Sequence, residues 1–171
     1  MVEATNNAAG LLVTFDWGLF LSILGATFSV VLAGIGSSIG VGLAGQAASG
    51  VISEEPEKFT KCLILQALPA TQGIYGFLGA FIIMNSLGIL GGNIKEVTNA
   101  QGWQIFFASW PVAFGGLLSG IYQGKVSASS MAIVSKAEND YAKGIILAVM
   151  VETYAVLGLV ATILLLNGII K

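Results

Sequence analysis

Charged residues are almost absent from four long stretches of this chain. No Asp, Glu, Lys or Arg occurs in 17–53, 62–94 or 97–124, and the stretch 144–170 contains one charged residue, Glu152. Each stretch exceeds the roughly 20 apolar residues with which an α-helix spans a hydrocarbon core about 30 Å thick. Helices satisfy their own backbone polar groups, as lipid requires. The pattern predicts an all-α membrane protein with four transmembrane helices.

The composition supports this class and excludes others. Of the 171 residues, 56% are hydrophobic and only 9% are charged, whereas soluble domains carry about 25% charged residues. The lone Cys62 excludes an intrachain disulfide. The absence of histidine excludes histidine metal sites and histidine general bases. A net charge of −2 gives no reason to expect a nucleic-acid partner. The first residues lack the basic region of a cleavable signal peptide.

The two halves of the chain align without a gap when each residue n is paired with residue n + 82. This alignment pairs Gly34 with Gly116 and places the polar segment 53–61 (SEEPEKFTK) over 135–143 (SKAENDYAK). Chance matching of small residues is the alternative, but the aligned polar segments argue against it. We call this alignment the repeat register. It predicts a first helical hairpin and a second one with the same topology, a linker between them, and an N-terminal extension: 17–90, 104–171, 91–103 and 1–16.

The lysines predict an orientation, since the chain contains no arginine. Cytoplasmic loops of membrane proteins carry an excess of basic residues. Five lysines lie in or beside the connections within the two hairpins, and two lie on the opposite side. Both connections are therefore expected on the cytoplasmic face, with both termini outside. The five are Lys58, Lys61, Lys125, Lys136 and Lys143, and the two are Lys95 and Lys171.

The glycines of the first stretch allow two interpretations. The segment 40–45 (GVGLAG) matches G-x-G-x-x-G, but that dinucleotide motif requires a preceding strand and a helix N-terminus. Small residues also recur every fourth position, which lets helix backbones approach closely in lipid. We favour this second interpretation and expect helices one and three to pack against each other or against copies of themselves. The small residues are Gly36, Gly40, Ala44 and Ala48, and Gly116, Gly120, Gly124 and Ala128.

Glu152 is the main candidate for function. An ionised carboxylate at the bilayer centre costs about 2.5–3.5 kcal/mol on insertion scales. It becomes tolerable when it is protonated or paired with a cation, and a group that changes between these states exchanges ions. The alternative is a protonated glutamic acid that only holds helices together. In the repeat register Glu152 pairs with Ala70, so one repeat retains the acid.

Neutral oxygen groups gather in the first repeat at the depth of this acid. Thr71, Gln72 and Tyr75 occupy positions i, i+1 and i+4, on one side of helix two. A hard cation such as Na⁺ prefers several oxygen ligands, and the ligand geometry sets selectivity. A proton requires only the carboxylate. The grouping with Glu152 therefore favours a sodium site.

Two further features bear on this site. Pro69 removes a backbone donor and is expected to disturb the helix around Leu65, which frees a carbonyl oxygen. Gln123 lies near the cytoplasmic end of helix three, at a depth that the sequence does not fix. Interhelical hydrogen bonding, which is common in membrane bundles, is the alternative role for Thr71, Gln72 and Gln123.

Several motifs resemble those of one family. Over residues 18–170 the chain is similar to the proteolipid K, or c, subunits of bacterial V-type (A/V-type) rotary ATPases. The motifs that carry the resemblance are GIGSSIGVG (34–42), PEKF (56–59), LILQALPATQGIYGF (63–77), IYQGKV (121–126) and GIILAVMVETYAVLG (144–158).

The resemblance implies a ring of identical four-helix subunits that rotates in the membrane beside a stator. In sodium-transporting members, the carboxylate matching Glu152 binds the ion and the tyrosine matching Tyr75 bonds that carboxylate. Further ligands correspond to the side chains of Thr71, Gln72 and Gln123 and to the main chain of Leu68.

The resemblance also implies partners. Because the chain lacks arginine, a strong intramembrane counter-charge must come from another protein, which in this family is a stator arginine. No residue here is suited to ATP hydrolysis, so we expect a non-catalytic subunit that is coupled through 53–61 and 135–143 to central-stalk subunits. The expected location is the plasma membrane, with no organic cofactor.

Three other functions remain open from the sequence. The same ring could carry H⁺ instead of Na⁺, because a proton needs only Glu152. A small proton-coupled secondary transporter would also explain an isolated membrane acid. A structural channel-like protein would leave the oxygen groups near Glu152 unexplained.

Overall fold

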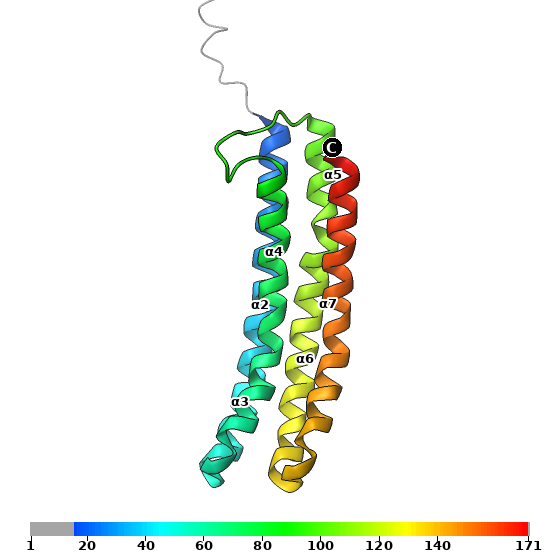
Figure 1. The fold of residues 1–171 in the computed structure, drawn as a ribbon. Coiled ribbons are helices and arrows are strands. Elements are labelled where there is room, and N and C mark those ends of the chain that lie inside the picture. Colours follow the sequence, from blue (N-terminus) through cyan, green and yellow to red (C-terminus); the bar gives the residue numbers. More distant parts are fainter. Residues whose placement is uncertain (1–15, 171) are drawn as a thin grey trace, which may run out of the picture.

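The computed structural model describes residues 16–170, which form four long helical segments lying side by side (Figure 1). Each segment is long and apolar enough to cross a membrane. This confirms the predicted all-α class and the four spans. The elements are α2 (Trp17–Glu54), a 3₁₀ turn (Pro56–Lys58), α3 (Phe59–Ala67), a second 3₁₀ turn (Leu68–Ala70), α4 (Thr71–Ser86), α5 (Asn99–Ala108), α6 (Trp110–Lys136), a third 3₁₀ turn (Glu138–Asp140) and α7 (Tyr141–Ile169).

The two ends of the bundle differ in kind. The short turns after α2 and α6 lie together at one end, which we call the turn end. The beginning of α2, the loop between α4 and α5 and the end of α7 lie at the other, the terminal end (Figure 1). The predicted extension 1–16 lies outside the described residues apart from Asp16, and Lys171 also lies outside them.

Helices α2 and α5 begin at corresponding positions of the repeat register. Asp16 caps α2, its side chain accepting a hydrogen bond from the Leu19 N–H at 2.9 Å. Thr98, at the corresponding position of the second repeat, caps α5 in the same way and forms a capping box with Gln101. The helix therefore begins at Asn99, inside the expected linker 91–103. A threonine cap with glutamine three residues later starts the helix there.

The turns at the turn end also repeat. α2 ends at Glu54 and α6 at Lys136, and each is followed by one residue outside helical geometry and a three-residue 3₁₀ turn. These positions correspond in the repeat register, which confirms the tandem hairpins. The third helical segment continues through Lys125 to Lys136, beyond the charge-free stretch 97–124.

Proline interrupts two of the four segments. Pro69 lies in the 3₁₀ turn between α3 and α4, and Pro111 lies in the first turn of α6. A proline removes one backbone donor and disfavours α-helical geometry before it. Beside Pro111, the Val112 N–H donates to the Thr162 hydroxyl at 3.2 Å. This hydrogen bond joins α6 to α7.

Helices α2 and α6 pack closely through glycine. A Cβ atom added at Gly124 would clash with the Gly40 backbone, and one added at Gly120 would clash with the Gly36 backbone. The stripe of small residues in each helix thus faces the other helix. The sequence left open whether these helices pack against each other or against copies of themselves, and the structure shows that they pack against each other.

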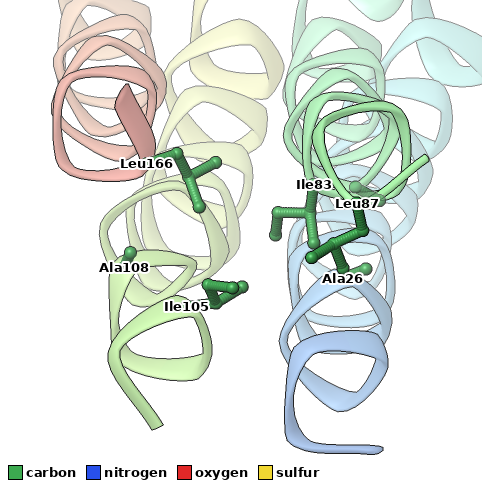
Figure 2. Packing of buried hydrophobic residues seen from close by; sticks show 7 residues of the cluster. Ala26, Ile83, Leu87, Ile105, Ala108 and Leu166 are labelled. Atoms are coloured by element: carbon green, nitrogen blue, oxygen red, sulfur yellow. The ribbon is translucent and has the colours of Figure 1, made fainter. Parts of the chain in front are cut away.

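Apolar clusters lie on either side of the bundle's middle. At the terminal end a cluster joins residues of all four segments: Ala26, Ala80, Ile83, Leu87, Ile105, Ala108 and Leu166 (Figure 2). Toward the turn end a second cluster contains Ala48, Cys62, Leu65, Met131 and Val134. Between them the bundle buries polar side chains, among them Gln72 and Gln123.

The outer surface of α7 is strongly apolar. Residues such as Ile146, Met150, Leu157 and Leu164 are largely exposed along this helix. An apolar surface of this length requires lipid or another protein chain to cover it.

Candidate ion site

Glu152 lies near the middle of the bundle, half-buried on α7. Its carboxylate accepts hydrogen bonds from two other segments. The Tyr75 hydroxyl of α4 donates to Oε1 at 2.6 Å, and the Gln123 Nε2 of α6 donates to Oε2 at 3.4 Å. Donors from both repeats therefore meet at the acid.

Two glutamines form the buried layer behind the carboxylate. Gln72 and Gln123 are both 0% exposed. The Gln72 Nε2 donates to the Gln123 Oε1 at 2.5 Å. Burying an amide without a hydrogen-bond partner costs free energy. The pair therefore favours one position of α4 along α6, the position at which the two amides meet. Gln123, whose depth the sequence left open, lies at the level of Glu152.

Further contacts connect Gln72 to the backbone between α3 and α4. The Thr71 hydroxyl donates to the Leu68 carbonyl oxygen at 3.0 Å and lies 3.5 Å from the Gln72 Oε1. The Leu68 carbonyl belongs to the 3₁₀ turn that contains Pro69. The distortion lies at Leu68–Ala70, a few residues after Leu65, where we expected it.

Comparison with known proteins connects this geometry to a family. The sequence profile of the ATP synthase C-subunit family matches residues 24–83 and again 106–165, and these two segments correspond in the repeat register. The chain belongs to the ATP synthase C-subunit family. The double match coincides with the two hairpins, which is independent support for the duplication.

Relatives within the family include both sodium and proton proteins. The chain is 46% identical over 154 residues to the V-type sodium ATPase subunit K of Enterococcus hirae, covering 90% of this chain and 95% of the relative. It is 37% identical over 153 residues to the A-type ATP synthase subunit K of Methanocaldococcus jannaschii, covering 90% and 64%. It is 21% identical over 150 residues to the 16 kDa proteolipid of the human V-type proton ATPase, covering 88% and 93%.

These matches confirm the resemblance to rotary-ATPase proteolipids. The names of the relatives include both ions, so family membership alone does not choose between Na⁺ and H⁺. The local chemistry of this chain must decide that question.

The electrostatics of the site are simple. The groups that contact the carboxylate are neutral donors. Among residues 16–170, no group of three or more His, Cys, Asp or Glu side chains comes together. The site thus carries one formal negative charge. Glu152 also lines a shallow apolar hollow with Val149, Thr153, Val156 and Leu157 on α7, so the acid is reachable from the outer side of that helix.

All six residues singled out from the sequence belong to this network. Two hydroxyls that were not singled out flank Gln123 on α6, one turn away in each direction. Ser119 and Ser127 are buried, and neither hydroxyl has a hydrogen-bond partner within the described part of the chain. Their spacing of four residues from Gln123 is the sequence signal that indicates a shared helix face.

Proposed function

We propose that this chain is a rotor-ring subunit of a V-type ATPase and carries Na⁺ across the membrane. Glu152 binds the ion, the side chains of Thr71, Gln72 and Gln123 and the main-chain oxygen of Leu68 supply further ligands, and Tyr75 bonds the carboxylate. One observation carries the proposal: these six residues form a continuous chain of contacts around one half-buried acid.

The charge of the site favours a monovalent ion. One carboxylate neutralised by Na⁺ or H⁺ leaves no net charge, whereas a divalent cation would leave a positive charge in lipid, which is costly. Na⁺ also makes use of the amide, hydroxyl and carbonyl oxygens, since hard cations take several oxygen ligands. Rotation of a glutamine amide by half a turn exchanges its nitrogen and its oxygen. The amides can therefore either donate to an empty carboxylate or present oxygen to an ion.

The repeat register supports a ring of copies. An apolar groove on α6 and α7 faces away from the first hairpin. Its lining residues correspond in the repeat register to the face of the first hairpin that contacts α6. The lining residues are Phe114, Gly115, Leu118, Ser119, Tyr122, Val151 and Tyr154, and the corresponding residues are Leu32, Ala33, Gly36, Ser37, Gly40, Pro69 and Gln72.

The complementary surface lies on α2. Gly34 and Gly42 have nothing within 4 Å of an added Cβ, and Ser38 between them is exposed. In the repeat register they correspond to Gly116, Gly120 and Gly124, which pack against α2 within the chain. The stripe on α2 of one copy therefore fits the groove of the next copy. Such head-to-tail contacts generate a ring when the rotation closes.

The remaining parts of the machine come from other subunits. The chain has no arginine, so a stator arginine supplies the charge that stabilises empty, ionised Glu152. ATP is hydrolysed elsewhere and is coupled to this non-catalytic chain through the turn end. The proposed location is the plasma membrane, with the turn end cytoplasmic and both termini outside.

Carbodiimide labelling of Glu152 tests the proposal. Because bound Na⁺ excludes the proton that the reagent requires, Na⁺ should slow the labelling of isolated rings at fixed pH. K⁺ at equal ionic strength is the control. Labelling that does not respond to Na⁺ would favour the same ring working with protons.

Native mass measurement separates the ring from a small secondary transporter. The ring predicts a large closed assembly of this chain in detergent. A dimer as the largest species would support the transporter instead. Thermal stabilisation by Na⁺ would count against a purely structural channel-like role.

A further inference from the structure

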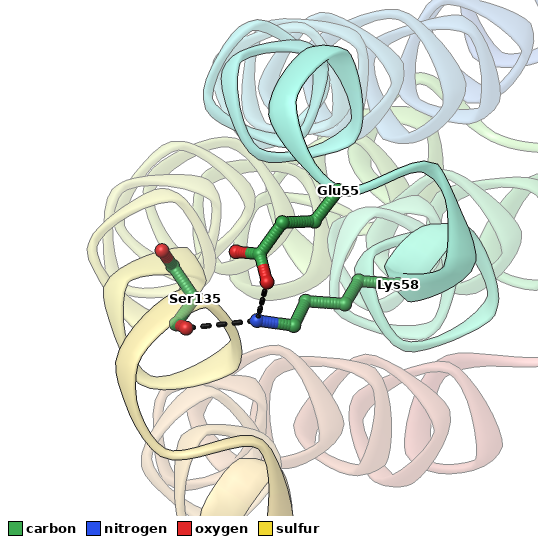
Figure 3. A network of polar contacts seen from close by, with 3 residues as sticks. All are labelled: Glu55, Lys58 and Ser135. Carbon is green, nitrogen blue, oxygen red and sulfur yellow. Dashed lines mark hydrogen bonds and ion pairs between the residues drawn. The ribbon is translucent and has the colours of Figure 1, made fainter.

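A buried lysine joins the two hairpins at the turn end. Lys58, the last residue of the first 3₁₀ turn, is only 5% exposed. Its Nζ donates to the Ser135 carbonyl oxygen at 2.8 Å and lies 2.5 Å from the Glu55 Oε2 (Figure 3). The side chain thus reaches from the turn of the first hairpin to α6 of the second. We call these contacts the Lys58 tie.

The acceptor on α6 is suited to a cation. Ser135 is the residue before the last of α6, so its carbonyl is one of the four that lack a donor within the helix. Helix C-termini carry partial negative charge and favour lysine. Glu55 supplies the opposite full charge, which a buried ammonium group requires.

The Lys58 tie and the glutamine pair connect the same two segments. α3 begins directly after Lys58, and the second segment continues from there to Gln72. On α6, Gln123 precedes Ser135 within one continuous helix. At a rise of about 1.5 Å per helical residue, the stretches 58–72 and 123–135 each span about 20 Å along the bundle. Together the two connections fix how far the second helical segment slides along α6.

The sequence provides the tie at one interface only. In the repeat register, Lys58 corresponds to Asp140 and Glu55 to Ala137. Asp140 pairs with Lys143 within its own turn, at 3.0 Å, and a carboxylate cannot donate to a carbonyl as lysine does. The interface that contains Glu152, Gln72 and Gln123 is thus the interface that also contains the lysine.

From this coincidence we infer that Lys58 is a positioning residue for the ion site. By fixing the register of α3 and α4 against α6, it holds Gln72 and Gln123 together beside Glu152. The inference rests on the proposed ion-binding function. It assigns a role to the lysine of the PEKF motif, which the ion site itself does not use.

Lys58→Met is the direct test, because methionine retains an apolar stem and removes the ammonium group. Rings of this variant should need about tenfold more Na⁺ to protect Glu152 from carbodiimide. Their labelling rate without Na⁺ should also rise several-fold, since Tyr75, which moves with α4, no longer donates to the carboxylate. Rings with Lys58→Arg, which keeps a positive charge, should show a protecting Na⁺ concentration and a Na⁺-free labelling rate within twofold of the wild-type values.

Lys143→Met is the matched control, because Lys143 is exposed and pairs within the other turn. It should leave both values unchanged. If Lys58→Met rings match wild type within twofold in both values, the inference is wrong. Should that variant form no rings, Glu55→Gln replaces it, with a smaller change in the same direction expected and an absent change contradicting the inference.

The two readouts separate this inference from the proposed function. If wild-type rings show no Na⁺ protection, the sodium proposal fails. The labelling rate without Na⁺ still measures the hydrogen bond from Tyr75 to Glu152 and still tests Lys58.

Discussion

The two hairpins share a backbone and differ in chemistry. Helices α2 and α5 begin at corresponding positions of the repeat register, as do α3 and α7. In each hairpin a threonine hydroxyl also donates to a main-chain oxygen at the same place. Thr71 donates to the Leu68 oxygen, and Thr153 donates to the Met150 oxygen. These two equivalent hydrogen bonds depend on a threonine that is present at the same position of both repeats.

The differences lie at a few positions around the proposed ion site. In the repeat register Glu152 corresponds to Ala70, Gln72 to Tyr154, Gln123 to Val41 and Tyr75 to Leu157. The second hairpin thus provides the charge and Gln123, whereas the first provides the remaining oxygen groups. The proposed site thus lies at the interface between the hairpins, and we propose that duplication let one of two equivalent interfaces specialise.

The largest expected effect comes from removing the charge. Glu152→Gln should reduce ATP-driven ion transport by the assembled enzyme to background, because a neutral amide neither binds nor releases a cation. Transport into proteoliposomes measures this, and native mass measurement should show an intact ring. Glu96→Gln in the exposed loop between α4 and α5 is the matched control and should transport normally.

Moving the acid sharpens the comparison. Ala70→Glu combined with Glu152→Ala places the carboxylate at the corresponding position of the other repeat. It should restore neither transport nor Na⁺-sensitive labelling, since the glutamines lie at the other interface. Recovery of either would show that the neutral ligands are dispensable.

Glycine substitutions distinguish packing within the chain from packing between copies. Gly124→Ala adds a methyl group against the Gly40 backbone and should destabilise the chain by about 1–3 kcal/mol. Gly42→Ala, at the corresponding position of the first repeat, meets nothing within 4 Å among the described residues. It should leave chain stability unchanged and reduce the ring population instead. Thermal unfolding in detergent and native mass measurement separate these outcomes, and equal behaviour of the two variants would contradict the ring interface.

The glutamine layer should contribute less than the acid. Gln72→Leu leaves a buried acceptor on Gln123 unsatisfied, which costs about 1–3 kcal/mol of stability. Because the change also removes a proposed oxygen ligand, the Na⁺ concentration for half-protection should rise at least tenfold. Tyr154→Phe, at the corresponding position of the second repeat, alters a side chain that is 69% exposed. It should change that concentration by less than twofold. A similar effect from both variants would argue against a specialised interface.

The smallest expected effect concerns the tyrosine hydroxyl. Tyr75→Phe removes one donor from the Glu152 carboxylate and leaves the oxygen ligands in place. The labelling rate without Na⁺ should rise a few-fold because the ionised form loses support. Tyr141→Phe, at the start of α7 near the turn end, is the control. An unchanged rate for Tyr75→Phe would mean that this hydrogen bond does not stabilise the ionised acid.

Much of the fold follows from the sequence for physical reasons. Long charge-free stretches require helices in lipid, and the spacing of Gly36, Gly40, Gly120 and Gly124 indicated the close contact between α2 and α6. The repeat register predicted the depth of Thr71 and Gln72 relative to Glu152. These features depend on local pattern or on internal repetition, which one sequence contains.

Other features depend on contacts between distant segments. Neither the height of Gln123 nor the contact between Val112 and Thr162 follows from local pattern, since each depends on how α6 meets a neighbouring helix. The Lys58 tie also joins residues far apart in the chain. In the sequence, the tie is visible only as a difference between the repeats, where Asp140 replaces Lys58. The reason for this difference emerges from the structure, in which Ser135 accepts a hydrogen bond from Lys58.

The most direct test of the specialised interface is a high-resolution density map of the assembled ring in Na⁺. We predict a cation between Glu152, Thr71, Gln72 and Gln123 in every copy, and no cation beside Tyr154 at the junction between copies. An ion at that junction, or a carboxylate turned into bulk water away from the glutamine pair, would contradict it.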